Sequence, residues 1–165
     1  MNIITYSLEK KIPIFIQFNL TRRCNLRCVH CCLEDGEKPE GDRGNDTNRE
    51  LNLPEIRAVL EQLAQAGCLV LTFSGGEVLL REDLIDIISS ARKLDFAVRI
   101  FTNGTLVGKR EIEAFRRFHI QEVHVSLYAA EASIHDAITS VPGSWAKTLE
   151  GVRLMREAGI PVKIK

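Results

Sequence analysis

The sequence predicts an α/β fold in which strand–helix units repeat along one parallel sheet. Short segments rich in Ile, Val and Phe alternate with longer segments whose apolar residues recur at helical spacing. Each strand segment also has one apolar face and one more polar face. The 165 residues, 45% of them hydrophobic and 27% charged, can form one core of this kind. We therefore expect right-handed crossovers between neighbouring parallel strands.

Five segments have the composition of strands. They are residues 12–20, 69–73, 96–102, 121–128 and 160–165. Pro13 stands near the start of the first segment, where a missing N–H is tolerated. This segment ends just before the first of several cysteines.

The predicted helices have recognisable ends. The first should begin at Asn52, with Pro54 in its first turn and Glu55 completing a capping box, and should end at Gly67. A last helix should be capped by Ser144 and end at Gly159. The remaining helices are expected near residues 81–94 and 109–118.

The two faces of the strands indicate an open or incomplete barrel. In the third strand Val98 and Ile100 would pack against helices, whereas Arg99, Phe101 and Asn103 would face the other way. A doubly wound sheet would read as continuous apolar runs, and a closed eight-stranded barrel would have an apolar interior. A polar inner face favours a wider or incomplete barrel with room for ligand and water. The alternative is a sheet with one solvent-exposed face.

The charge balance excludes several classes of partner. The 22 basic residues equal the 22 acidic ones, so the chain lacks the basic field of a nucleic-acid-binding protein. No apolar run approaches the roughly 18 residues of a membrane span, and the N-terminal segment is charged where a signal peptide is apolar. We expect a cytoplasmic protein that binds neither nucleic acid nor membrane.

A polar segment interrupts the first strand–helix unit. Residues 33–51 contain many Gly, Asp, Asn and Glu residues and show no apolar periodicity. We expect a flexible loop there, within a single domain that covers residues 1–165.

Four of the five cysteines lie close together after the first predicted strand. Cys24, Cys28 and Cys31 have the spacing C-x3-C-x2-C, with Cys32 beside them. Zinc sites usually combine two short ligand pairs separated by a dozen or more residues, and no second pair follows here. Three thiolates suit an iron–sulfur cluster in which one iron keeps an open position. Cys32 is poorly placed to reach another corner of a cluster, and Cys68 is predicted to be a small buried hydrophobe.

The segment FNLTRRCNLRCVHC, residues 18–31, resembles the signature of the radical S-adenosylmethionine superfamily, in which C-x3-C-x-aromatic-C holds a 4Fe-4S cluster. The resemblance continues at Ser74-Gly75-Gly76-Glu77, which is similar to the family's GGE motif. Thr102-Asn103-Gly104-Thr105 and the run from Val125 onward are also similar to family sequences, so that most of residues 12–165 is covered. His30 stands at the aromatic position, as is common in the peptide-modifying branch of the family.

The resemblance implies a partial (βα)6 TIM-like barrel, truncated here after about five strands, and two cofactors, a 4Fe-4S cluster and S-adenosyl-L-methionine. Cys24, Cys28 and Cys31 would be the cluster ligands. The cofactor-binding residues would be His30, Gly75, Gly76, Glu77, Asn103 and Ser126. In this assignment the glycines let the backbone approach S-adenosylmethionine, and the Glu77 carboxylate accepts a hydrogen bond from its amino group. Ser126 would contact its ribose or its carboxylate.

The resemblance further implies an enzyme of the oxidoreductase or maturase type. One electron entering the cluster would cleave S-adenosylmethionine to methionine and a 5′-deoxyadenosyl radical, which abstracts hydrogen from the substrate. The run from His135 to Lys165 is most similar to members with a C-terminal SPASM domain. This implies a peptide or protein substrate, an external electron donor such as flavodoxin or ferredoxin, and a native chain that continues past Lys165. No residue is assigned a catalytic role.

Two other functions remain open on the residues alone. A non-catalytic iron–sulfur electron carrier would use the same cysteines without binding S-adenosylmethionine. A zinc-dependent interaction module would hold a single metal ion instead of a cluster.

Overall fold

The computed structural model describes residues 2–31 and 49–165, and it confirms the predicted fold class. Five parallel strands form one sheet in the order β1-β2-β3-β4-β5. The strands are β1 (Phe15–Thr21), β2 (Val70–Gly75), β3 (Ala97–Thr102), β4 (Glu122–Val125) and β5 (Val162–Ile164). The helices are α1 (Ile3–Lys10), α2 (Leu53–Gln65), η2 (Val78–Leu80), α3 (Leu84–Lys93), α4 (Lys109–Arg117), α5 (Ala132–Thr139) and α6 (Ser144–Glu157). The loop predicted at 33–51 falls largely outside the described residues.

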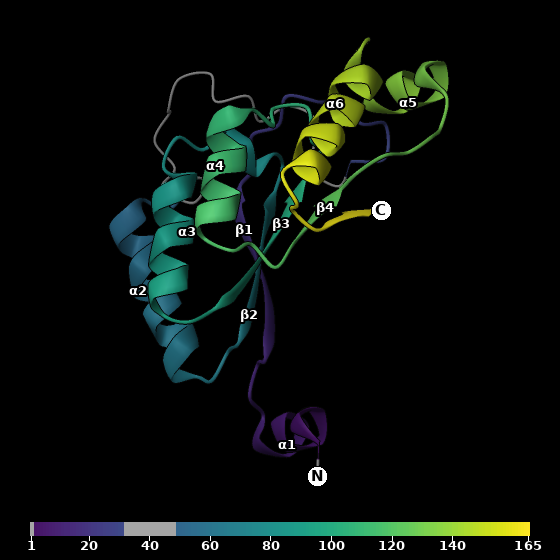
Figure 1. Ribbon diagram of the computed structural model, residues 1–165. Coiled ribbons are helices and arrows are strands. Elements are labelled where there is room, and N and C mark those ends of the chain that lie inside the picture. The colour runs from purple at the N-terminus through teal and green to yellow at the C-terminus, as the bar shows by residue number, and fades with distance from the viewer. Residues whose placement is uncertain (1, 32–48) are drawn as a thin grey trace.

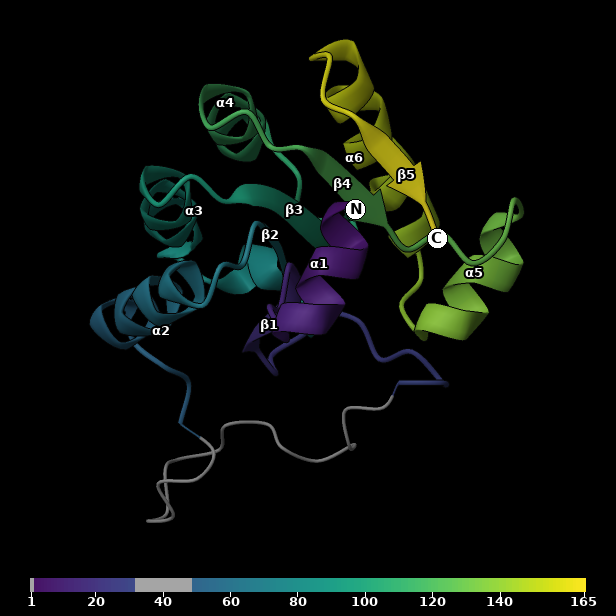
Figure 2. The same ribbon diagram turned by 90° about the horizontal axis from the view of Figure 1, so that it is seen from below.

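The sheet is curved into an arc, and helices cover its convex side. Helices α2, α3, α4 and α6 lie along this side, each between two consecutive strands of the chain (Figures 1 and 2). The concave side, named here the open face, carries no such layer in the described part of the chain. The arrangement is a partial barrel. None of the described helices is long and apolar enough to cross a membrane.

Burial confirms the predicted difference between the two faces. Val98 and Ile100 of β3 are completely buried, as are Leu71 and Phe73 of β2, and all four belong to one hydrophobic core beneath the helices. Arg99 lies between Val98 and Ile100 on the open face and is only partly buried. Because side chains alternate along a strand, the core occupies one side of the sheet and leaves the other for polar groups.

Helix α2 begins as its sequence predicts. The Asn52 Oδ1 atom accepts a 3.0 Å hydrogen bond from the Glu55 amide, and the Glu55 carboxylate accepts one of 2.8 Å from the Asn52 amide. Pro54 occupies the first turn, where its missing N–H costs nothing. Gly67 follows the helix with φ +86°, a conformation that favours glycine.

Two helices, α1 and α5, are absent from the prediction. Helix α1 lies at the amino end of β1, away from the main body (Figure 1), with its N-cap at Asn2. Both helices have eight residues. Helices this short are marginal on propensity alone, so their existence depends on capping and on tertiary contacts that a periodicity pattern does not contain.

Helix α6 begins at the predicted residue with a different cap. Ser144 is its first residue, and the N-cap position is Gly143, with φ +79°. The capping group is the Asp136 carboxylate of α5, which accepts hydrogen bonds from the Gly143 amide, the Trp145 amide and the Ser144 hydroxyl at 2.6, 2.8 and 2.9 Å. The predicted Ser144 cap is therefore wrong, because a carboxylate from the preceding helix satisfies these donors.

The capping box of α2 generates a stability prediction. Asn52→Ala removes the side-chain acceptor for the Glu55 amide and should lower the free energy of unfolding by about 1 kcal/mol, within a range of roughly 0.5 to 2. Asn52→Asp keeps an acceptor at the helix N-terminus and should unfold near the wild type. Urea unfolding at pH 7 measures both, and equal stability of the Ala and Asp variants would contradict this cap.

Candidate functional site

The predicted metal ligands lie on a loop at the carboxyl end of β1. We call residues 22–31 the cysteine loop. Its backbone is held by the end of α5, because the Arg27 and Val29 amides donate hydrogen bonds to the Thr139 and Ile138 carbonyls at 3.0 and 2.9 Å. Carbonyls in the last turn of a helix have no partner inside the helix. Helix α5 thus uses its free carbonyls to position the cysteine loop.

The three thiols of the loop act on one another. Burial raises the pKa of Cys24 and of Cys28; repulsion from the Cys28 and Cys31 thiolates adds to the rise at Cys24, and repulsion from Cys31 adds to the rise at Cys28. Cys24 and Cys31 are exposed and Cys28 is half-buried, so the loop presents its sulfur atoms at the surface. Metal binding here would release protons from thiols that otherwise keep them.

The donor set of the cysteine loop consists of three thiols, Cys24, Cys28 and Cys31. Among residues 2–31 and 49–165, no three His, Cys, Asp or Glu side chains converge on a point that one metal ion could occupy. Thiolates bound to one zinc ion lie at most about 4.6 Å apart, since each Zn–S bond is about 2.3 Å. A 4Fe-4S cluster binds each thiolate through a different iron, so the thiolates it binds can lie farther apart. The donor chemistry of Cys24, Cys28 and Cys31 therefore fits the implied cluster.

The Gly75–Gly76 pair at the end of β2 lies against the cysteine loop. The Gly76 and Glu77 amides donate hydrogen bonds of 2.8 Å to the Thr21 and Arg23 carbonyls. A Cβ atom on Gly75 would lie 2.3 Å from the Thr21 oxygen, and one on Gly76 would lie 2.3 Å from the Arg23 oxygen. Gly75 also has φ +146°. Only glycines allow this contact between two backbones.

Glu77 is completely buried at the carboxyl end of the sheet. Its Oε1 atom accepts hydrogen bonds from the Thr102 hydroxyl at 2.7 Å and the Leu79 amide at 3.0 Å, and its Oε2 atom accepts one from the Asn103 amide at 2.7 Å. Burial raises the pKa of Glu77, while these hydrogen bonds oppose the rise. The carboxylate thus connects the Gly75–Gly76 turn, named here the glycine turn, to the end of β3.

The Asn103 side chain continues this connection to the cysteine loop. Its Nδ2 atom donates to Asn25 Oδ1 at 2.9 Å and lies 4.0 Å from the Cys24 sulfur. Its Oδ1 atom accepts from the amide and the hydroxyl of Thr105 at 2.9 and 2.7 Å. The Thr105 hydroxyl in turn accepts from Asn25 at 2.8 Å. Asn103 therefore fixes the loop beside Cys24, and its side-chain amide is already hydrogen-bonded to Asn25 and Thr105.

His30 and Ser126 meet at Tyr128. The His30 and Tyr128 rings contact edge to face with centroids 4.7 Å apart. Hydrogen bonding with Ser126 lowers the pKa of Tyr128, but burial and the neighbouring Cys28 thiolate raise it overall. Tyr128 also lowers the pKa of Cys28 by hydrogen bonding, less than burial raises it. His135 of α5 stacks on Tyr128 at 5.6 Å and accepts a 3.2 Å hydrogen bond from its amide.

The structure thus brings the predicted residues to one end of the sheet. Tyr128 and His135 are the members that no motif indicated, although Tyr128 follows Ser126 by two residues and so belongs to the polar face of the fourth predicted strand. Cys68 lies elsewhere, buried near the start of β2, with its sulfur 3.6 Å from the Ile14 carbonyl oxygen. Cys32 is outside the described residues.

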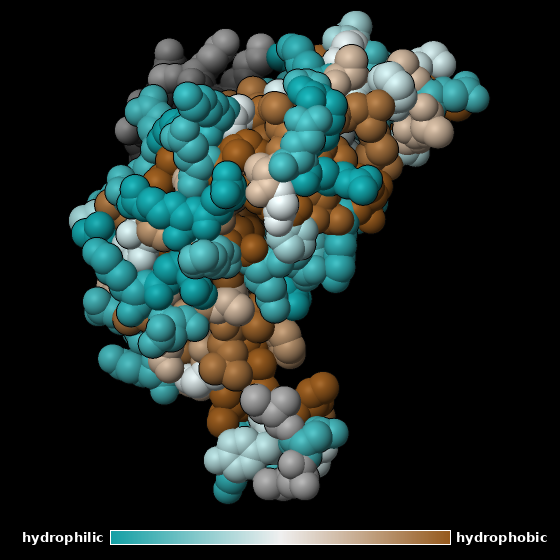
Figure 3. All heavy atoms as spheres, viewed as in Figure 1, coloured by the Kyte–Doolittle hydropathy of each residue, from teal (hydrophilic) through white to brown (hydrophobic). Residues whose placement is uncertain are grey.

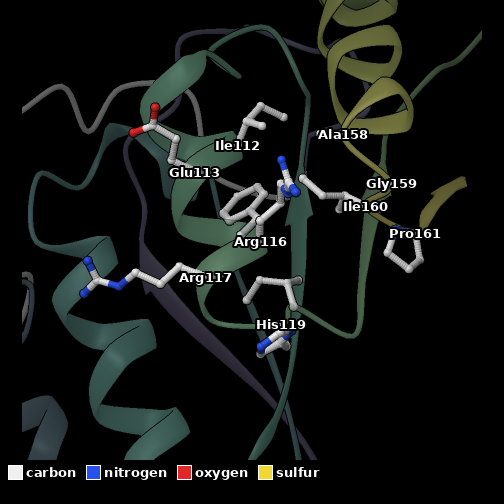
Figure 4. Close-up of a pocket in the computed structure, with 11 residues that line it drawn as sticks. Ile112, Glu113, Arg116, Arg117, His119, Ala158, Gly159, Ile160 and Pro161 are labelled. Atoms are coloured by element: carbon white, nitrogen blue, oxygen red, sulfur yellow. The ribbon is translucent and has the colours of Figure 1, made fainter.

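A pocket of about 710 Å³ lies at the opposite end of the strands. It opens between α4 and the segment that joins α6 to β5 (Figure 4). Hydrophobic residues are visible in this region, between the mostly hydrophilic outer residues of α4 and α6 (Figure 3). Its lining includes Arg116, His119 and Pro161. Residues 119–120 and 158–161 precede β4 and β5, whereas the predicted site residues lie at or after the carboxyl ends of β1, β2, β3 and β4. The pocket contains none of the site residues.

Comparisons with known proteins agree with this geometry. AdoMet-dependent heme synthase of Methanosarcina barkeri is 33% identical over 156 residues, and PqqA peptide cyclase of Rhodopseudomonas palustris is 31% identical over 153. These matches cover 92% and 93% of this chain but only 42% and 39% of the relatives, so the chain spans about two fifths of their length. Streptococcus suis SuiB bound to S-adenosylmethionine superposes with a TM-score of 0.78 at 19% identity, over 98% of this chain and 36% of SuiB.

The structural likeness to SuiB supports the partial-barrel fold. The family model of the radical SAM superfamily matches residues 18–165, which include the cysteine loop, the glycine turn and all strands after β1. Together with the relative at 33% identity, this match decides the family. The chain belongs to the radical SAM superfamily.

Proposed function

We propose that this chain is the core of an enzyme that cleaves S-adenosyl-L-methionine reductively at a 4Fe-4S cluster and abstracts hydrogen from a peptide substrate. The observation that supports the proposal is the contact between the cysteine loop and the Gly75–Gly76 turn, since it brings the start of the loop and Cys24 close to the buried Glu77 carboxylate. The two alternatives, an electron carrier and a zinc module, do not need this carboxylate.

The cysteine loop would hold the cluster through Cys24, Cys28 and Cys31. When bound together, the cluster and S-adenosylmethionine supply an electron and a 5′-deoxyadenosyl radical. The chain's own contribution is to keep the three sulfur atoms in one arrangement through the α5 carbonyls and the Asn103 side chain. His30 and Ser126 would contact S-adenosylmethionine from the Tyr128 side of the loop.

Glu77 would receive the amino group of S-adenosylmethionine. A carboxylate offers about four acceptor positions, and three of those on Glu77 are filled, two at Oε1 and one at Oε2. A buried carboxylate without a cationic partner is costly, and burial raises the pKa of Glu77 accordingly. An ammonium group at Oε2 would stabilise the ionised form by a charge-assisted hydrogen bond.

The proposal of a peptide substrate rests on relatives. PqqA peptide cyclase is among them by name, and SuiB has been solved bound to the precursor peptide SuiA. A second candidate is a tetrapyrrole, because the AdoMet-dependent heme synthase is 33% identical to this chain. The polar open face of the sheet supports either use, since it leaves a hydrophilic surface next to the site.

The proposal includes further partners and a place in the cell. The cluster would take its electron from an external donor such as flavodoxin or ferredoxin, in the cytoplasm. The domain would be completed by at least one more strand–helix unit and a SPASM domain. The 42% and 39% of the relatives' length that this chain covers leave room for both.

The assignment of ligands predicts the effect of single cysteine substitutions. Cys24→Ala, Cys28→Ala and Cys31→Ala should each remove most of the bound iron after anaerobic reconstitution, because each takes away one of three thiolates. Cys68→Ala is the matched control and should keep wild-type iron content, since Cys68 is buried away from the site. Iron and zinc are counted by elemental analysis. Full iron content in any of the first three variants would reject the assignment, and a colourless protein with one zinc per chain would favour the zinc module.

The proposed role of Glu77 predicts weaker cofactor binding in Glu77→Gln. The substitution keeps the size of the side chain but removes a charge-assisted hydrogen bond of roughly 1.5 to 3 kcal/mol. The dissociation constant of S-adenosylmethionine should rise about ten- to hundred-fold. Glu111→Gln is the control and should bind normally, because the Glu111 carboxylate only accepts a 3.0 Å hydrogen bond from the Gly108 amide at the start of α4. Calorimetry on reconstituted protein that shows equal affinity for wild type and Glu77→Gln would exclude the role.

A further inference from the structure

A cluster of charged side chains lies on the open face, below the candidate site. Glu122 is at its centre, with its Oε1 atom 3.0 Å from Arg99 Nε and 3.1 Å from His124 Nε2, and its Oε2 atom 2.6 Å from Lys163 Nζ. Arg99 Nε also donates a 2.8 Å hydrogen bond to Gln121. The contacts join three strands, because Arg99 pairs with Glu122 and His124 pairs with Lys163 in the sheet.

The cluster contains more cations than carboxylates. Glu122 is the one carboxylate that the strands β1–β5 carry on the open face. It is ionised at neutral pH, because the Lys163 ammonium 2.6 Å away, with the neighbouring His124 and Arg99 side chains, lowers its pKa to about 2. Arg99 and Lys163 already balance and exceed its charge. Lys165, directly after β5, adds a third cation and has no carboxylate partner among the described residues.

The cations keep donors that form no hydrogen bond within residues 2–31 and 49–165. The hydrogen bond of Arg99 to Gln121 and its 3.0 Å contact with Glu122 both run through Nε, and its two terminal nitrogens donate no hydrogen bond within the described part of the chain. The Lys163 side chain is 63% exposed, whereas that of Glu122 is 10% exposed. A second carboxylate could therefore approach Arg99 and Lys163 from the open side without displacing Glu122.

Aromatic rings flank these donors. Phe15 is 60% exposed, with the Arg99 guanidinium 5.9 Å from its ring centroid. Phe101 stacks on His124 at 4.8 Å and carries the Lys165 ammonium 3.9 Å from its centroid. Both rings therefore add a cation–π contact to a cation of the cluster, Phe15 to Arg99 and Phe101 to Lys165.

The cluster lies within reach of the candidate site. His124 precedes Ser126 by two residues, and Arg99 precedes Asn103 by four residues, on the same face of their strands. At about 3.3 Å per strand residue these separations are roughly 7 and 13 Å. A peptide whose reacting carbon lies at the site could thus place a neighbouring side chain on the cluster.

We propose that Arg99 and Lys163, supported by Lys165 and the Phe15 and Phe101 rings, form a substrate subsite for the carboxylate of an Asp or Glu side chain. The inference rests on the proposed peptide-modifying function. Charge complementarity carries it, since a cluster that only stabilised the sheet would need no cations beyond those that neutralise Glu122. The subsite would select acidic peptides and set their register relative to the site.

The test compares two capped tripeptides as probes, acetyl-Gly-Glu-Gly-amide and acetyl-Gly-Gln-Gly-amide. They have nearly the same shape, and only the first carries a carboxylate. Calorimetry with the full native protein, reconstituted and at low salt, should show that the Glu peptide binds at least about five-fold more tightly, a preference that salt weakens. Equal binding of the two peptides to the wild type would overturn the proposal.

Variants assign the preference to the cluster. Lys163→Gln should reduce it below about two-fold, and Lys163→Arg should restore it, because Arg keeps the charge. Lys109→Gln, on the outer surface of α4, is the matched control and should keep the wild-type preference. Glu122→Gln removes the protein's own carboxylate from Arg99 and Lys163 and should therefore tighten binding of the Glu peptide. An unchanged preference for the Glu peptide in Lys163→Gln would contradict the subsite. A weaker preference in Glu122→Gln would also contradict it, provided that the circular dichroism spectrum of this variant matches that of the wild type.

A separate measurement distinguishes this inference from the proposed function. Wild-type protein reduced with dithionite should convert S-adenosylmethionine to 5′-deoxyadenosine without any peptide. Cleavage without a preference for the Glu peptide would reject the subsite alone. A preference for the Glu peptide without cleavage would reject the radical chemistry and leave the subsite standing.

Discussion

The candidate site depends on one close contact between two stretches of backbone. Strands β1 and β2 are parallel neighbours in register up to Asn19 and Ser74; the register then shifts by one residue, so that Thr21 pairs with Gly75, and the segments that follow stay together. The Gly76 and Glu77 amides bond to carbonyls of the first segment, at a separation that leaves no space for a Cβ on either glycine. This contact fixes where the cysteine loop begins and directs Glu77 toward the end of β3. The positions of the thiols and of the buried carboxylate are therefore set by the same interaction.

Two further layers keep the loop in place. On one side Glu77, Asn103 and Asn25 form a continuous path of hydrogen bonds from the glycine turn to the neighbourhood of Cys24. On the other side α5 binds the loop backbone through its last carbonyls, and Asp136 of the same helix caps α6. Supports of this kind commonly govern metal affinity as strongly as the ligands do. In this fold they come from three segments outside the loop itself, the turn at Gly75–Glu77, the end of β3 and α5.

Local patterns predicted the parts of the structure that depend on nearby residues. The capping box spans only the four residues from Asn52 to Glu55, and the two faces of β3 need only alternation, so both predictions were correct. The Ser144 cap was wrong and α5 was missed, because Asp136 and the cysteine loop supply contacts that no local pattern contains. The C-x3-C-x2-C spacing and the resemblance indicated the site. The Gly75–Gly76 pair was predicted to let the backbone approach S-adenosylmethionine. In the structure, the two glycines lie against the Thr21 and Arg23 carbonyls.

The most direct test of this account is the iron content of Gly76→Ala. The new methyl group would lie 2.3 Å from the Arg23 oxygen, so the loop must move while all three cysteines remain. Gly108→Ala is the control, because a Cβ there meets only the end of the flexible Glu111 side chain, at 3.3 Å. After anaerobic reconstitution Gly76→Ala should bind iron about ten- to hundred-fold more weakly than Gly108→Ala. Wild-type iron content and an unchanged electron paramagnetic resonance spectrum in Gly76→Ala would show that the backbone contact does not position the cluster ligands.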